Sequence, residues 1–241
     1  EPWLLAGTAD RWDRVAPWVG PLGPTMSASG AIAFRAESAD GPAVFVARDG
    51  TCERVAGVDD EVVGFEGLPL IDRAGRVVVR VNRADGHGAL LVVRDGARTE
   101  LCREGLAVRA LGRFPMLTDA GRIAFSAIDR DGDPSVFVGA LDDFDGTLEK
   151  LDIGSFEHVR GALTTDLGGG IFYAATRDLP LAVFQFGPSA RPRRLIGIGD
   201  PIHGSIIRQF VLNPVSIADS TRHVAMRIEL DDGREQIVRL D

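Results

Sequence analysis

The chain has 241 residues, of which 45% are hydrophobic and 26% are charged, the balance of an ordinary folded protein. Its formal net charge of −8 at pH 7 excludes a general nucleic-acid binder and disfavours docking on anionic membranes. No apolar run approaches the roughly 18–20 residues of a membrane-spanning helix, so membrane insertion is not expected.

The first seven residues, EPWLLAG, form a short apolar segment that ends in a glycine. Segments of the same kind recur later in the chain, and each is followed by a turn-forming stretch. They lie at 51–57, 98–104, 148–154 and 193–199. The chain therefore opens with what is elsewhere the last strand of a repeated unit.

The strongest repeat begins with PTMSASGAIAFRA at 24–36 and returns at 69–81 and 115–127. In each copy a proline precedes a glycine by six residues, and a small polar or acidic residue precedes that glycine by three. Weaker copies lie at 162–174 and 214–228. The first four of these anchor glycines, at 30, 75, 121 and 168, are 45 to 47 residues apart, a period typical of propeller blades.

Each unit contains four short runs rich in β-branched and aromatic residues, separated by turns that contain Gly and Asp. This is the chemistry of strands and not of helices. The tripeptide Arg-Asp-Gly at 48–50 and 94–96 predicts tight turns between third and fourth strands. The fifth unit stops after its third strand at 235–240, so residues 1–7 are expected to supply its fourth strand.

The sequence therefore predicts a single all-β domain over 1–241: a five-bladed β-propeller with four strands per blade, whose N-terminal strand closes the last blade. Closure in this way leaves no open sheet edge, and we expect a monomer. The blades are expected at about 12–57, 58–104, 105–154, 155–199, and 200–241 together with 1–7.

The repeated unit resembles that of bacterial tandem-repeat proteins with the pattern GDPAPG … PSINDxGxVAFRA … GIFV. Many of these proteins are large, exported and predicted to form propellers. The resemblance slightly favours a secreted or periplasmic location, leaves a cytoplasmic one open, and supplies no catalytic residues. The positions that carry it are Gly199, Asp200, Pro201, Pro24, Gly30, Ala33, Phe34 and Ala36.

Residues that differ between equivalent positions of the blades are the better functional candidates, because packing residues tend to repeat. Near the starts of the first strands such residues would meet at the mouth of a central channel. Aromatic rings and arginines there suit a planar or hydrophobic ligand that carries a carboxylate or a phosphate. The predicted ligand-binding residues are Trp18, Phe65, Arg109, Arg113, Arg160, His203, Arg208 and Phe210.

An alternative interpretation makes the same aromatics part of the core between blades. The arginines would then pair with Glu66, Glu157 or nearby aspartates. A further arginine repeats at one point of the second strand, at positions 35, 80 and 227, and this repetition favours a structural role.

Two functions fit these features. The first is a binding propeller that recognises a small anionic or aromatic ligand, or a protein partner, at the channel mouth. The alternative is a metal-independent lyase, cyclase or isomerase at the same place, with His158 and Glu157 as catalytic residues. In that case His158 could also lie near His203 and Asp200.

Metal and thiol chemistry is weakly indicated, and no cofactor is expected. Alternating carboxylates at Asp129, Asp131 and Asp133 suggest calcium, although the spacing of an EF-hand is not followed, which favours a solvated turn. Cys52 and Cys102 leave a disulfide and two buried free thiols as alternatives.

Overall fold

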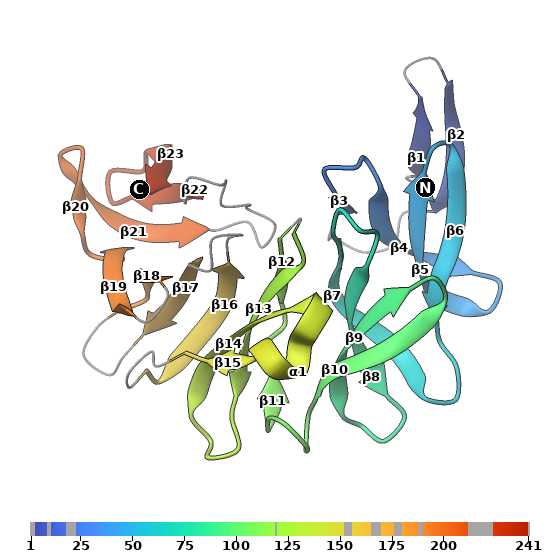
Figure 1. Ribbon diagram of the computed structural model, residues 1–241. Helices are drawn as coiled ribbons and strands as arrows, with labels where there is room; N and C mark the ends of the chain where they lie inside the picture. Colours follow the sequence, from blue (N-terminus) through green and yellow to red (C-terminus); the bar gives the residue numbers. More distant parts are fainter. Residues whose placement is uncertain are drawn as a thin grey trace. The chain divides into compact units, whose positions relative to one another are not determined.

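The computed structural model describes residues 3–8, 11–17, 23–118, 120–151, 156–164, 170–175, 180–187, 190–211 and 224–240. Antiparallel strands dominate these residues, and several sheets have four strands (Figure 1). The all-β prediction is therefore confirmed. The chain divides into two compact units, Glu1–Arg113 with Asp119–Gly121, and Phe114–Thr118 with Arg122–Asp241.

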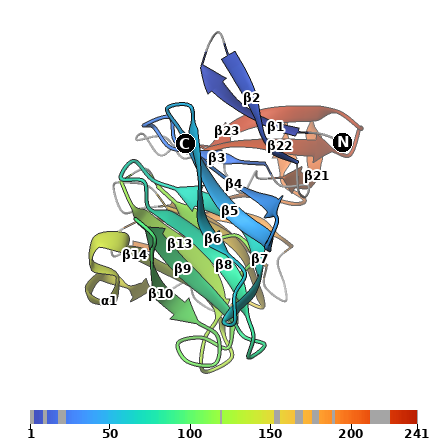
Figure 2. The same ribbon diagram turned by 90° about the vertical axis from the view of Figure 1, so that its right-hand side faces the viewer.

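The first unit contains two four-stranded sheets whose strands follow one another in chain order, and Figure 2 shows them side by side. One sheet is formed by β3 (Thr25–Met26), β4 (Ile32–Ser38), β5 (Gly41–Arg48) and β6 (Thr51–Gly57). The other is formed by β7 (Val62–Ile71), β8 (Val77–Arg83), β9 (Gly88–Arg94) and β10 (Ala97–Arg103). A short strand, β11 (Ala110–Leu111), follows.

Valines and alanines from both sheets of the first unit share one hydrophobic core. Val44 of β5 and Val79 and Val81 of β8 are completely buried in it. Burying such side chains stabilises the fold by roughly 1.5–3 kcal/mol each before entropy losses. The β-branched runs that predicted strands are therefore also the residues that hold neighbouring sheets together.

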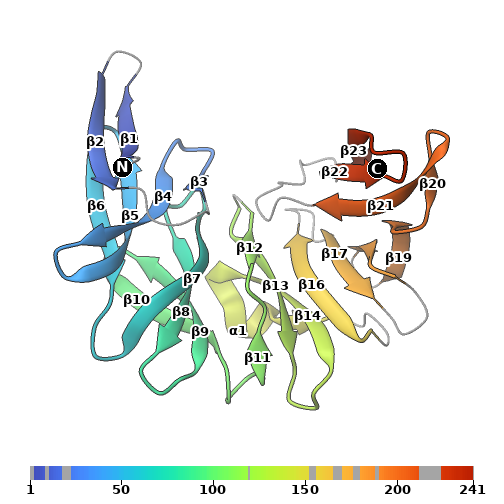
Figure 3. The same cartoon turned by 180° about the vertical axis from the view of Figure 1, so that it is seen from behind.

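The second unit continues the pattern, as Figure 3 shows from behind. Its first sheet contains β12 (Met116–Leu117), β13 (Arg122–Ile128), β14 (Pro134–Ala140) and β15 (Glu149–Lys150), and between the last two lie a 3-10 turn (Leu141–Asp143) and α1 (Phe144–Thr147). The next is formed by β16 (His158–Thr164), β17 (Gly170–Ala175), β18 (Ala182–Gly187) and β19 (Ala190–Gly197). The last is formed by β20 (Pro201–Ile202), β21 (Ser205–Val211), β22 (Val224–Leu230) and β23 (Glu235–Leu240).

The repeated Pro…Gly motif is a turn between the first and second strands of a sheet. Its glycines adopt left-handed backbone angles, with φ of +82° at Gly30, +79° at Gly75 and +83° at Gly121. The small polar residue three positions earlier closes the turn, since Gly30 N donates to Ser27 O and Gly75 N to Asp72 O, at 3.0 Å each. The motif is thus explained by backbone geometry that favours glycine.

The Arg-Asp-Gly turns have the predicted form. Asp49 and Gly50 both have positive φ, as do Asp95 and Gly96, and each pair joins two strands directly. Two positive φ values in a two-residue hairpin loop are the signature of a type I′ turn. The sequence pattern therefore predicts which residues form these hairpin turns.

The N-terminal strand has a partner next to it in the sequence. The strand β1 (Trp3–Thr8) pairs with β2 (Arg11–Pro17), from Trp3 opposite Pro17 to Thr8 opposite Arg11. Among the described residues, β23 is hydrogen-bonded to β22 alone. Pairing with the next strand in sequence requires a much shorter loop to be closed than pairing with a strand more than 200 residues away.

Candidate functional site

In two of the sheets, the turn between the second and third strands is hydrogen-bonded to the start of the first strand or to the link before it. In the first unit Ala84 N donates to Glu61 O at 2.9 Å, which joins the turn after β8 to the link before β7. In the second unit Asp231 N donates to Ile206 O at 2.9 Å in the corresponding place. In these two sheets the two kinds of connecting segment therefore lie at the same end of the strands.

Twelve positions before the anchor residues of the repeats, three of the described residues are exposed, whereas Phe156 at the same repeat position packs against a core. Val63, Arg109 and Arg208 are all exposed, and the Arg208 guanidinium lies 3.6 Å from Glu229. Bulges near the starts of β7 and β21 alter the strand register at this point, and bulges re-aim side chains. The repeat position predicted to contribute arginines is thus open to solvent in both units.

The aromatic candidates fit the alternative interpretation instead. Phe65 is half-buried and packs against the core of the first unit. Phe210 is 9% exposed and belongs to the core of the second unit, with Ile207 and Met226. Trp18 lies outside the described residues.

The second-strand arginines make structural contacts at all three places, as their repetition predicts. Arg35 Nη1 donates to the Phe65 carbonyl oxygen at 2.7 Å, which ties β4 to β7. Arg80 lies 2.8 Å from Glu66 and 3.3 Å from Glu104. Arg227 lies 3.1 Å from Glu235.

The positive charge of Arg113 acts on the Arg35 guanidinium in the first unit. Burial lowers the pKa of the half-buried Arg35 guanidinium below its usual value, the charge of Arg113 lowers it further, and Glu66 opposes the shift. Arg113 is exposed. An anion that binds between like charges relieves their repulsion, so this pair is a candidate anion site.

Glu104 positions the strand that separates the two arginine candidates of the first unit. Its carboxylate accepts from Leu111 N and Gly88 N, at 2.7 Å each, and from Arg80. Leu111 lies between Arg109 and Arg113 in the sequence, so Glu104 holds the backbone that carries both. Sequence reasoning did not select Glu104, because its partners lie 7, 16 and 24 residues away.

The catalytic candidates lie in the second unit at the start of β16. Glu157 and His158 are exposed, and Glu157 N donates to Ala175 O at 3.0 Å. Arg160 lies two residues further along β16, opposite Tyr173. The structure thus places His158 and Glu157 at the solvent-facing beginning of a strand.

His203 and Asp200 are already engaged by other residues. His203 forms a two-residue turn with Gly204, both with positive φ, and its Nδ1 lies 2.6 Å from Gln236 Oε1. The two oxygens of Asp200 accept from Arg194 at 2.8 Å each, and this pair lowers the pKa of Asp200. A site that joins His158, His203 and Asp200 would have to break these contacts.

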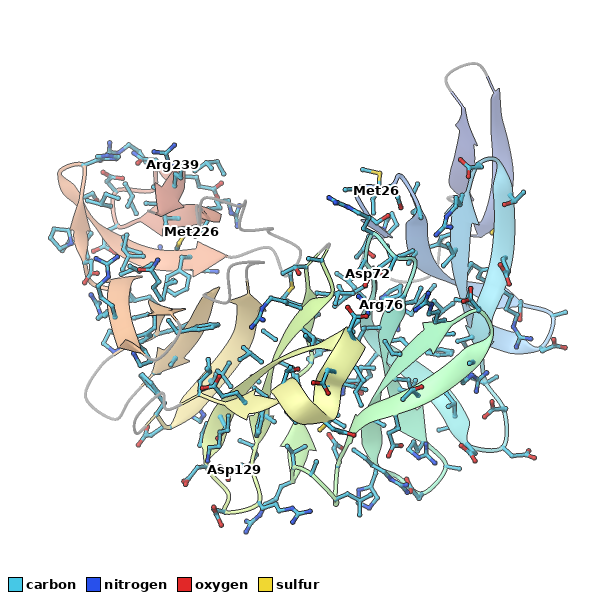
Figure 4. The ribbon with its side chains drawn as sticks, in the orientation of Figure 1. Met26, Asp72, Arg76, Asp129, Met226 and Arg239 are labelled. Atoms are coloured by element: carbon cyan, nitrogen blue, oxygen red, sulfur yellow. The ribbon has the colours of Figure 1, made fainter. Side chains whose placement is uncertain are left out.

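Asp129, the first of the suggested calcium ligands, caps the turn between β13 and β14 (Figure 4). Its carboxylate accepts from three backbone N–H groups, of Asp131, Gly132 and Asp133, from the Ser135 hydroxyl, and from Lys150. A carboxylate surrounded by donors fits the turn interpretation. No cluster of three potential metal ligands occurs among the residues that the structure describes.

We expect Asp129 to make stability depend on acidic pH. The Lys150 ammonium and the turn N–H groups hold the pKa of Asp129 well below its usual range. The stabilisation is therefore present above the unfolded pKa of about 3.9 and is lost as pH falls toward the folded value. Melting temperatures of wild type and Asp129→Asn from pH 7 down to about pH 3 should converge as pH decreases. A constant difference would contradict this role.

Both cysteines are free, so no disulfide joins them. Cys102 is buried, as expected, and burial raises its pKa to about 11. Cys52 is exposed, which differs from the expectation of two buried thiols. Cys52 lies in the outer strand β6, where one side of the sheet faces solvent.

No family model matches the sequence, and no curated relative is found. Solved structures share its fold. TolB from Acinetobacter baumannii is 15% identical, with a TM-score of 0.55 over 88% of this chain and 50% of that one. A puromycin-hydrolyzing peptidase from Mycobacterium tuberculosis is 13% identical, with a TM-score of 0.58 over 100% of this chain and 38% of that one.

This chain thus spans half or less of the length of those proteins. At such low identity the likeness shows the fold alone, which is propeller-like and all-β. Within the described residues, no helix is long and apolar enough to cross a membrane.

Proposed function

We propose that this protein is a binding propeller of five blades, one for each sequence repeat, and that it recognises an anionic ligand through the arginines of its first unit. The supporting observation is that the positive charge of the exposed Arg113 acts on the half-buried Arg35 guanidinium and lowers its pKa. An anion that binds there relieves the repulsion between them.

The two arginines have different roles in this proposal. Arg35 is fixed by its hydrogen bond to Phe65 O, so its position is set by the fold. Arg113 is exposed and reaches ligand from the end of the segment that Glu104 anchors through Leu111. A fixed and an exposed guanidinium suit a carboxylate or phosphate, which accepts paired N–H donors.

Exposed apolar residues of the first unit favour a ligand that also has an apolar part. Val63 and Leu106 are exposed large hydrophobic residues in the same unit. Val63 and Arg109 occupy equivalent positions of successive repeats. Benzoate and inorganic phosphate are therefore suitable probes, since they share the anionic charge and differ in the apolar ring.

We expect Arg113→Ala to weaken the binding of both probes about tenfold, because a charge-assisted hydrogen bond is worth roughly 1.5–3 kcal/mol. Isothermal titration calorimetry at low ionic strength measures the two dissociation constants. Arg94→Ala is the matched control, since Arg94 is exposed in the same unit and lies next to Asp95. Equal effects of the two variants would mean that probe binding depends only on the net charge of the protein, which would contradict the proposed site.

A further inference from the structure

The turns of the Pro…Gly motif differ in one contact between the second and third repeats. In the second repeat, Asp72 Oδ1 accepts from Arg76 N at 2.9 Å, and Asp72 Oδ2 accepts from Arg76 Nε at 2.6 Å. In the third repeat, Thr118 and Arg122 occupy the same two positions. A threonine has one side-chain oxygen, so it can replace only one oxygen of the carboxylate.

Thr118 reproduces the first contact and not the second. Its hydroxyl oxygen accepts from Arg122 N at 3.1 Å, as Asp72 Oδ1 does from Arg76 N. Arg122 Nε is buried and has no hydrogen-bond partner among the described residues. The third repeat has therefore kept the arginine and lost the acceptor for its Nε, and a buried donor without an acceptor is unfavourable.

Arg122 also differs from the other arginines whose Nε is buried and unpaired. Those are Arg80, Arg83 and Arg194, and each of them forms an ion pair through its Nη atoms. Within the described part of the chain, no carboxylate pairs with Arg122, which is half-buried. The positive charge of Arg122 is thus without the counter-charge that its equivalents have.

We propose that Arg122 and Thr118 form a binding site for a small carboxylate, which takes the place that the Asp72 carboxyl group fills in the second repeat. A carboxylate suits a guanidinium group because its oxygens accept N–H donors and its charge balances that of the arginine. The ligand is small, of the size of formate, because Thr118 is only 9% exposed and Arg122 is half-buried. This site lies in the second unit and is separate from the anion site proposed at Arg113 in the first.

Thermal unfolding in sodium formate and in sodium chloride of equal ionic strength tests this site. The Arg113→Ala variant is the parent protein for the measurement, since it lacks the anion site proposed in the first unit. Formate at about ten times its dissociation constant should raise the melting temperature of this parent by about 3–6 °C relative to chloride. Adding Arg122→Met should abolish the increase, because the guanidinium that holds formate is gone.

A second variant supplies the missing carboxylate from the chain itself. Adding Thr118→Asp to the same parent should raise the melting temperature in chloride by a few degrees and remove the response to formate, since the site is then filled. Thr118→Ser is the matched control. It keeps one hydroxyl oxygen and adds no charge, so it should keep the response to formate.

Several results would overturn the proposal. They are a parent protein that does not respond to formate, a response that persists with Arg122→Met, and a response that persists with Thr118→Asp. Asp119 lies outside the described residues, and if only an Asp119→Asn variant responds to formate, the chain's own Asp119 supplies the carboxylate. Each response is the difference between formate and chloride for one variant, so a change in that variant's own stability does not alter the conclusion.

Discussion

Replacing Asp72 with alanine should lower the free energy of unfolding by about 3–5 kcal/mol, because it breaks a buried ion pair and leaves the arginine behind. Asp72 is completely buried, and Arg76 is nearly so. The carboxylate accepts from Arg76 N at 2.9 Å and from Arg76 Nε at 2.6 Å (Figure 4). Urea unfolding measures the loss.

Two further variants distinguish the contribution of the ion pair to stability from that of the turn that contains it. Ser27→Ala changes the equivalent position of the preceding repeat, where a buried hydroxyl contacts Ser29 and Ala31 O, and should cost only about 1 kcal/mol. Asp72→Ala/Arg76→Met removes both charges and should recover much of the stability, since an apolar replacement avoids the unpaired charge. If Asp72→Ala is as mild as Ser27→Ala, the pair is not what stabilises this turn.

The same turn shows why the repeat could be read from the sequence. Gly75 is required by its positive φ, and a polar side chain three residues earlier has a backbone group of its own turn within reach. Both requirements are local, and they recur at Gly30 and Gly121. Because these requirements are local, the same residue types recur at the same positions of each repeat. The strands and hairpins could therefore be predicted from the sequence.

The pairing of the N-terminal strand was not predictable in the same way. Counting strands left one place empty beside β23, and residues 1–7 matched it in type. The structure pairs β1 with β2, its neighbour in the chain, a partner that counting strands did not predict. Strand composition does not distinguish two partners that are both antiparallel strands, because any edge offers the same backbone groups.

The candidate site was predictable only in part for a related reason. The repeat comparison selected Arg109, Arg113 and Arg208, which are exposed, but also Phe210, which is core. Position within a repeat gives the place on a strand, whereas the bulges that decide which way a side chain faces depend on the pairing. Arg35 was assigned a structural role, and the electrostatic effect of Arg113 on it could not be predicted from the sequence, because it depends on how β4 and the segment after β11 fold.

We expect loss of the Glu104 carboxylate to lower both the stability of the protein and its affinity for anions. Its two oxygens accept from different backbone N–H groups, of Gly88 and Leu111. Glutamine has the same shape but presents an NH2 group to one of them. Glu104→Gln should therefore destabilise the protein by about 2–4 kcal/mol, through one opposed N–H group and a weakened contact to Arg80.

The binding effect of the same substitution follows from the place of Leu111. Leu111 N and Arg80 both donate to one carboxylate oxygen, so the glutamine amide oxygen takes that place and its NH2 group faces Gly88 N. A neutral amide oxygen holds Leu111 N less strongly than a carboxylate does, so the segment from Arg109 to Arg113 is less well ordered, and the affinity for phosphate should fall severalfold at a temperature where the variant is folded. Glu100→Gln is the control: Glu100 contacts Arg83 at 3.2 Å on the surface, and such pairs contribute roughly 0–1 kcal/mol. A Glu104→Gln protein that is destabilised but binds phosphate like wild type would separate Glu104 from the anion site and leave it a purely structural anchor.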